Sequence, residues 1–165
     1  MALMVTAGGA AAAGTSACGG NSRGDEDPAG IGVVRSVVDG DTIDVRIDGR
    51  HDRVRLIGID TPEVAAPDHP AECYGPEASR YSAGLLVAGM KVRLVRDVVG
   101  RDDYGRLLAY VFRVEDNLFV NEHIIAAGFA RPLNIEPNSA YHRRFVEAAA
   151  AAKRSSLGLW GGCSS

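Results

Sequence analysis

The sequence predicts an α+β domain, mainly β, in which a small five-stranded barrel carries about three helices. The first observation is a series of short apolar runs separated by tight turns at Asp39-Gly40 and Asp48-Gly49, which is typical of a meander. The second is the alternation of apolar and polar residues over positions 42–47, the pattern of a half-buried strand. The third is the length of 165 residues, which suits one domain with a real core and is too short for two.

Apolar alternation and turn signals place the strands. The expected strands are residues 31–38, 42–47, 53–60, 91–96 and 106–114. In the second of them, Ile43, Val45 and Ile47 should point inward. The third strand must stop at Thr61, because a residue that precedes a proline, here Pro62, is held in extended geometry.

Capping residues and helical spacing place the helices at residues 76–88, 122–127 and 140–155. Pro76 suits the first turn of a helix, and Gly89 should end that helix. Asn121 and Ser139 are expected to cap the other two. The core residues expected from the last helix onward are Phe145, Val146, Ala149, Ala152, Leu157, Leu159 and Trp160. Five strands with helices after the third and the fifth match an OB-fold barrel with helical additions.

The charge of the chain argues against a general binder of nucleic acid. The formal net charge is -3, and it falls to -1 once the first thirty residues, with one basic and three acidic side chains, are set aside. Such a binder would be basic, so attraction to nucleic acid must come from local arginines and a metal. The four histidines, at positions 51, 69, 123 and 142, show no metal-ligand spacing, and we interpret them as surface or helix-face residues.

Residues 1–18 resemble an export signal. The run before Cys18 is apolar, too short to span a membrane, and ends in small residues, as in a bacterial lipoprotein processing site. It departs from that pattern because no basic residue precedes it and Thr15 stands where leucine is usual; the alternative is a disordered low-complexity tail. We expect a secreted or cell-surface monomer with a lipidated Cys18 as its membrane attachment. Residues 19–30 then form a flexible linker and residues 31–165 the domain.

The three cysteines require an explanation because their number is odd. We expect that Cys18 is separate and that Cys73 pairs with Cys163, provided that the chain is exported. A cytosolic location would instead require three free thiols.

One stretch organises the chain: an apolar strand that ends in acidic residues, Arg55-Leu56-Ile57-Gly58-Ile59-Asp60-Thr61-Pro62-Glu63. Three further blocks flank it, Asp39-Gly40-Asp41-Thr42, Tyr74-Gly75-Pro76-Glu77-Ala78-Ser79 and Asp102-Asp103-Tyr104-Gly105-Arg106. In this order and spacing, over about residues 33–160, the blocks resemble the staphylococcal nuclease family. The resemblance implies an OB-fold enzyme that cleaves the 5′ oxygen–phosphorus bond of DNA or RNA and leaves 3′-phosphate ends.

Hard oxygen donors suit Ca²⁺ or Mg²⁺, and the resemblance implies Ca²⁺. Asp41 and Asp60 are the expected side-chain ligands, with the carbonyl of Thr61 as a third. A cation there would polarise a phosphodiester and neutralise developing charge. Glu63 could orient or deprotonate the attacking water.

Two arginines are expected to hold the phosphate. Arg55 and Arg106 can each donate two parallel hydrogen bonds to phosphate oxygens, which lysine cannot do, and Tyr104 could contact a terminal phosphate or line the nucleotide pocket. Arg55 and Asp60 are an odd number of residues apart, so an ideal strand would point them to opposite faces. The resemblance implies that both lie near one phosphate. Glycine permits a bulge or sharp bend, so we predict an irregularity near Gly58.

The chain departs from the family pattern in two places. Leu133 and Ile135 stand where the best-known member carries tyrosines that contact the nucleotide, so stacking on bases would be weaker. Asp103 stands where a lysine often precedes the Tyr-Gly-Arg block. These changes leave open a catalytically inactive OB-fold module that binds nucleic acid or another ligand, and a structural surface lipoprotein. The retained carboxylates and arginines favour the enzyme.

Overall fold

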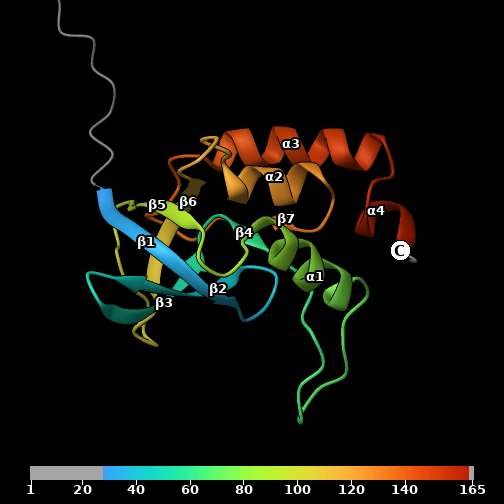
Figure 1. Cartoon of the computed structure of the whole chain (residues 1–165). Coiled ribbons are helices and arrows are strands. Elements are labelled where there is room, and N and C mark those ends of the chain that lie inside the picture. Colours follow the sequence, from blue (N-terminus) through green and yellow to red (C-terminus); the bar gives the residue numbers. More distant parts are fainter. Residues whose placement is uncertain (1–27, 164–165) are drawn as a thin grey trace, which may run out of the picture.

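The computed structural model of the protein describes residues 28–163 (Figure 1). In chain order the elements are β1 (Pro28–Val37), β2 (Thr42–Ile47), β3 (Arg50–Leu56), β4 (Ile59–Asp60), α1 (Gly75–Leu85), β5 (Lys91–Val95), β6 (Leu107–Arg113), α2 (Val120–Ala126), β7 (Arg131–Pro132), α3 (His142–Arg154) and α4 (Leu159–Gly162). The expectations for the export signal and for Cys18 lie outside the described residues. Within them, no helix is both long and apolar enough to cross a membrane.

Five strands close into a barrel in the order β1-β2-β3-β6-β5, which confirms the predicted fold class. Neighbouring strands are antiparallel except for β3 and β6, which run parallel. β1 begins at Pro28, three residues before the expected start, because Pro28 and Gly30 already pair with β5. The predicted bounds of β2 are confirmed.

The helices cover one side of the barrel. α2 packs on β6, and α3 lies over α2, so these two helices form a layer beside the strands (Figure 1). Phe145 of α3 is fully buried and lies among the rings of Tyr110, Phe119 and Tyr141. This aromatic cluster joins the helical layer to the barrel.

The chain bends sharply at Gly58, as predicted. β3 ends at Leu56, the backbone turns, and the two-residue β4 then pairs with β7. Gly58 has a φ of +80°, and a Cβ there would lie 2.3 Å from Cε2 of Phe145. Only glycine combines this backbone conformation with so close an approach to the aromatic cluster.

Gly58→Ala should therefore lower the free energy of unfolding by about 2–4 kcal/mol, from left-handed strain and the clash with Phe145. Gly49→Ala is the matched control, because Gly49 has a φ of +82° but a Cβ added there would meet nothing within 4 Å. Gly49→Ala should lower the free energy of unfolding by only about 1–2 kcal/mol. Chemical denaturation of both variants measures the difference, and equal losses would show that contact with Phe145 is unimportant.

The two expected helix caps are wrong. Phe119 and Tyr141 occupy the N-cap positions of α2 and α3. Asn121 is instead buried inside α2, where its side chain accepts a hydrogen bond from the Val111 N–H and donates one to the Ile57 carbonyl, both at 2.9 Å. Asn121 thus ties the helical layer to β6 and to the bend that follows β3.

Three smaller expectations also differ from the structure. α1 ends at Leu85, before Gly89, whose N–H donates to the Val34 carbonyl and so belongs to the turn that leads into β5. Val146 is exposed, because it lies one residue round the helix from the buried stripe of Phe145 and Ala149. Leu157 is exposed as well, in the segment between α3 and α4. Ser139, which does not cap α3, instead donates its hydroxyl to Glu136.

Candidate active site

Asp41 lies in the turn between β1 and β2 and is almost fully buried. Its Oδ2 accepts hydrogen bonds from the N–H and the hydroxyl of Thr61, at 3.0 and 3.1 Å. The turn packs directly on Thr61, since a Cβ on Gly40 would lie 2.5 Å from Thr61 Oγ1. Ser82 of α1 holds the turn from the other side by donating its hydroxyl to the Gly40 carbonyl at 2.5 Å.

Burial raises the pKa of Asp41 to about 6, against the opposing effects of the Arg55 charge and the hydrogen bonds from Thr61. The carboxylate is thus held in a place where its negative charge is only partly compensated. A perturbed carboxyl group of this kind is typical of functional sites, and a nearby cation would stabilise its ionised form.

The guanidinium of Arg55 connects the two sides of the bend at Gly58. Its Nη1 donates to the carbonyls of Leu56 and Ile59, at 2.7 and 2.9 Å. Its Nη2 lies 3.1 Å from Oδ2 of Asp41 and 3.5 Å from Oδ1 of Asp60. The bend therefore brings Arg55 and Asp60 together despite their odd separation. Asp60 is half exposed, so this carboxylate also faces solvent.

Glu63 follows this cluster at the start of the loop that leads to α1. Its carboxylate is exposed and accepts no hydrogen bond from any residue in the described part of the chain. Its backbone is firmly held: the carbonyl accepts from the Glu72 N–H at 2.9 Å, and the N–H donates to Glu72 Oε2 at 3.2 Å. A Cβ on Gly75 would lie 2.0 Å from the Glu63 carbonyl oxygen, so α1 begins directly against the loop base.

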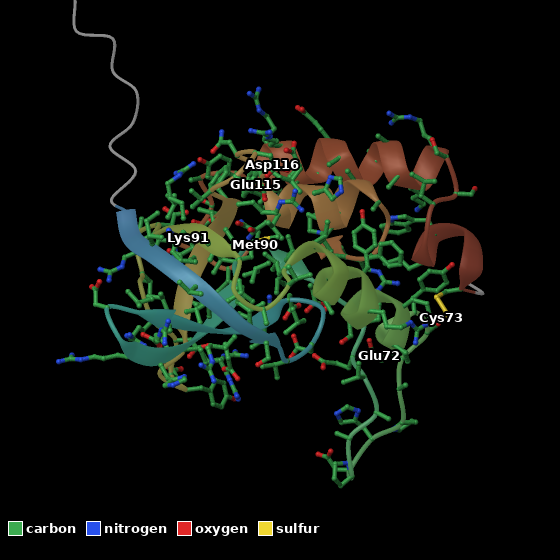
Figure 2. The ribbon with its side chains drawn as sticks, viewed as in Figure 1. Glu72, Cys73, Met90, Lys91, Glu115 and Asp116 are labelled. Carbon is green, nitrogen blue, oxygen red and sulfur yellow. A yellow bond between two sulfur atoms is a disulfide. The ribbon has the colours of Figure 1, made fainter. Side chains whose placement is uncertain are left out.

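A disulfide joins Cys73 to Cys163, the pairing expected from the sequence (Figure 2). Cys73 directly follows Glu72 at the base of the loop, and Cys163 is the C-cap of α4. The bond thus ties the C-terminal end of the described chain to the segment that holds Glu63.

Asp102 holds Arg106 in place. Its Oδ2 accepts from Nε of Arg106 at 2.7 Å, and its Oδ1 accepts the N–H groups of Tyr104 and Arg106 at 3.0 and 2.9 Å. Burial acts to raise the pKa of Asp102, but these hydrogen bonds and the Arg106 charge hold it below its ordinary value. Tyr104 is 86% exposed, and its ring centre lies 5.4 Å from Cζ of Arg106.

A cavity of about 280 Å³ brings five of the predicted site residues together. Its lining includes Arg55, Tyr104, Arg106, Leu133 and Ile135. That lining does not include Asp41, Asp60, Thr61 or Glu63. Asp41 and Asp60 are connected to it through their contacts with Arg55.

The donor set for a metal is small. Within residues 28–163, no three acidic, histidine or cysteine side chains form a cluster that could hold an ion. Asp41 and Asp60 form a pair of carboxylates that approach one nitrogen of Arg55. Two carboxylates and a backbone carbonyl fit a hard cation that keeps several waters and takes further oxygens from a phosphate.

Three residues that support this site were not assigned a role in it from the sequence. Ser82 braces the Asp41 turn, Asp102 orients Arg106, and Asn121 holds the Ile57 carbonyl at the bend. Asp102 had a signal, since an acidic residue that starts a turn often accepts the N–H groups that follow it. Ser82 and Asn121 had none, because their partners lie 42 and 64 residues away in the chain.

Comparison with known proteins matches residues 53–162 to the family described as Staphylococcal nuclease homologue. The thermonuclease of Staphylococcus intermedius is 40% identical over 128 residues, which cover 78% of this chain and 74% of that protein. The thermonuclease of Staphylococcus hyicus is also 40% identical over 128 residues, with 78% and 73% covered. Endonuclease YncB of Bacillus subtilis is 39% identical over 125 residues, or 74% of this chain and 58% of YncB.

Proposed function

Because the chain belongs to the staphylococcal nuclease family, we propose that it is a metal-dependent nuclease that hydrolyses phosphodiester bonds of DNA or RNA. One observation carries the proposal: the guanidinium of Arg55 contacts both acidic residues, Asp41 and Asp60, and lines the same cavity as Arg106. Under this proposal, the acidic metal ligands and the phosphate-binding arginines act on one phosphate group.

We propose Ca²⁺ as the metal, held by Asp41, Asp60 and the carbonyl of Thr61. Bound there, the ion would polarise the phosphodiester and neutralise charge that develops on it. The first support is the chemistry of the donors, which are all oxygens. The second is the carboxylate of Asp41, whose pKa is raised by burial, so that a nearby cation would stabilise its ionised form.

The protein groups divide the remaining work. Arg55 and Arg106 bind the non-bridging phosphate oxygens, and both are already held in place, Arg55 by two carbonyls and Arg106 by Asp102. Glu63 orients the attacking water or accepts its proton, as its exposed and unpaired carboxylate allows. The water oxygen bonds to phosphorus while the bond from phosphorus to the 5′ oxygen breaks. This leaves a 3′-phosphate on one fragment and, once the 5′ oxygen takes up a proton, a 5′-hydroxyl on the other.

The cavity beside the arginines would receive a base or sugar. Leu133 and Ile135 offer it apolar contact, and Tyr104 is the aromatic side chain in the described lining. Aliphatic contact is less favourable to a base than stacking on an aromatic ring, so we propose modest affinity and little selection between bases.

Glu63→Gln should reduce the rate of single-stranded DNA cleavage at least about 100-fold, because the amide cannot accept a proton from water. The matched control is Glu72→Gln, which makes the same charge change at the base of the same loop and should retain most of the activity. A gel assay of cleavage measures both. If Glu63→Gln cleaves at the wild-type rate, Glu63 is not the group that activates water. If the wild type binds DNA without cleaving it, the inactive binding module is the better description.

We also propose that the protein is an exported monomer, attached to a membrane through lipidated Cys18. The apolar residues before Cys18 support export. The disulfide between Cys73 and Cys163 supports it independently, because such bonds persist in oxidising compartments.

A further inference from the structure

A second hollow adjoins the candidate active site on the outer face of the barrel. It is an open groove of about 790 Å³, lined by Arg35, Ser36, Asp44, His51, Asp52, Arg53, Tyr104, Gly105 and Arg106. Tyr104 and Arg106 also line the cavity described above, so the two hollows share a wall. A chain that leaves the cavity past Arg106 therefore enters this groove.

Strand register explains how the groove is built. Ser36 of β1 pairs with Asp44 of β2, and Asp44 pairs with Arg53 of β3, which places the three side by side across the sheet. Arg53 and Arg55 are two residues apart on β3 and so share one face of the sheet. The register of β1 and β2 shifts between Val34 and Ser36, so Arg35 occupies a bulge, a feature that re-aims a side chain.

The groove carries a net positive charge, although the domain as a whole is slightly acidic. Its two carboxylates are neutralised: Asp44 receives two hydrogen bonds from Arg53, and Asp52 receives two from Arg101. Arg35 is exposed and has no carboxylate partner within residues 28–163. It therefore adds an uncompensated positive charge beside the paired Arg53.

We propose that this groove binds the sugar–phosphate backbone of a single nucleic-acid strand beyond the bond that is cut, with Arg35 as its main phosphate contact. The inference rests on the proposed nuclease function and adds that the preferred substrate is a polymer longer than a dinucleotide. The groove offers arginines and a serine hydroxyl for phosphate oxygens, and the exposed ring of Tyr104 at the shared wall for a base.

Arg35→Ala in the full chain tests the proposal. KM for a long single-stranded oligonucleotide should rise about three- to fivefold, the effect of losing one exposed ionic contact. Cleavage of a dinucleotide, which fills only the cavity, should not change. Fluorescence anisotropy measures binding of the long oligonucleotide in the presence of chelator. For Arg35→Ala, the slope of log K against the logarithm of the salt concentration should be less steep than for the wild type by about 0.7. Arg35→Lys should keep the wild-type slope, because the charge remains.

Arg154→Ala is the control, because it removes the same charge from an exposed position at the end of α3. The groove assignment is overturned if Arg35→Ala and Arg154→Ala change KM and the salt slope equally, or if Arg35→Ala impairs dinucleotide cleavage as much as polymer cleavage. The proposed function fails separately, if the wild type cleaves neither substrate. The anisotropy measurement still decides the groove in that case, since it requires no cleavage.

Discussion

Arg55→Lys should slow the cleavage of nucleic acid about 1,000-fold or more while the protein remains folded, the range expected when an arginine that stabilises a phosphoryl transition state is lost. Arg55 makes four contacts from two nitrogens, to two carbonyls and to Asp41 and Asp60. A lysine ammonium supplies one compact charge and cannot span this set. It still offers a positive charge to the buried carboxylate of Asp41, so the loss of stability should be small.

The control is Arg50→Lys, at the exposed start of the same strand. This variant should cleave at the wild-type rate. Steady-state kinetics on single-stranded DNA, together with a chemical unfolding curve for each variant, separates catalysis from folding. If Arg55→Lys keeps activity within a few-fold of the wild type, Arg55 does not hold the phosphate and the site must be placed elsewhere.

The second large effect concerns stability. Replacing Cys73 and Cys163 together by serine should lower the free energy of unfolding by about 4–5 kcal/mol, the chain-entropy value for a bond of this sequence separation, 90 residues. The bond closes a long loop of the unfolded chain, so that chain gains much freedom when the bond is removed. Guanidinium unfolding of the oxidised wild type and the double variant measures the difference.

A reducing agent supplies the matched control. It should destabilise the wild type by nearly the full amount and leave the double variant unchanged, because only the wild type has a bond to lose. Identical unfolding midpoints for the oxidised wild type and the double variant would contradict a stabilising role for the disulfide.

The barrel could be predicted because its signals are local. Alternation over residues 42–47 and the turn at Asp48-Gly49 mark two strands without any knowledge of their neighbours. The bend at Gly58 could also be predicted, because Arg55 and Asp60 have an odd separation and the family resemblance implies that both lie near one phosphate. β4 and β7 could not, because each has two residues, too few for a period to be visible.

Tertiary contacts account for the expectations that were wrong. Asn121 has the chemistry of a helix cap, but its amide is used 64 residues away at the Ile57 carbonyl. Gly89 has the chemistry of a helix end, yet it hydrogen-bonds to β1. Nothing in the sequence marks Arg35 as a binding residue. The groove beside it exists only once β1, β2 and β3 have paired.

The most direct test of the proposed nuclease is cleavage of single-stranded DNA by the full chain, first with Ca²⁺ and then with excess chelator. The two carboxylates at Arg55 and the arginines that line the cavity predict cleavage in Ca²⁺ that stops when the chelator is added. Absence of cleavage by the folded protein in Ca²⁺, Mg²⁺ or Mn²⁺, or cleavage that continues in chelator, would contradict a metal-dependent nuclease.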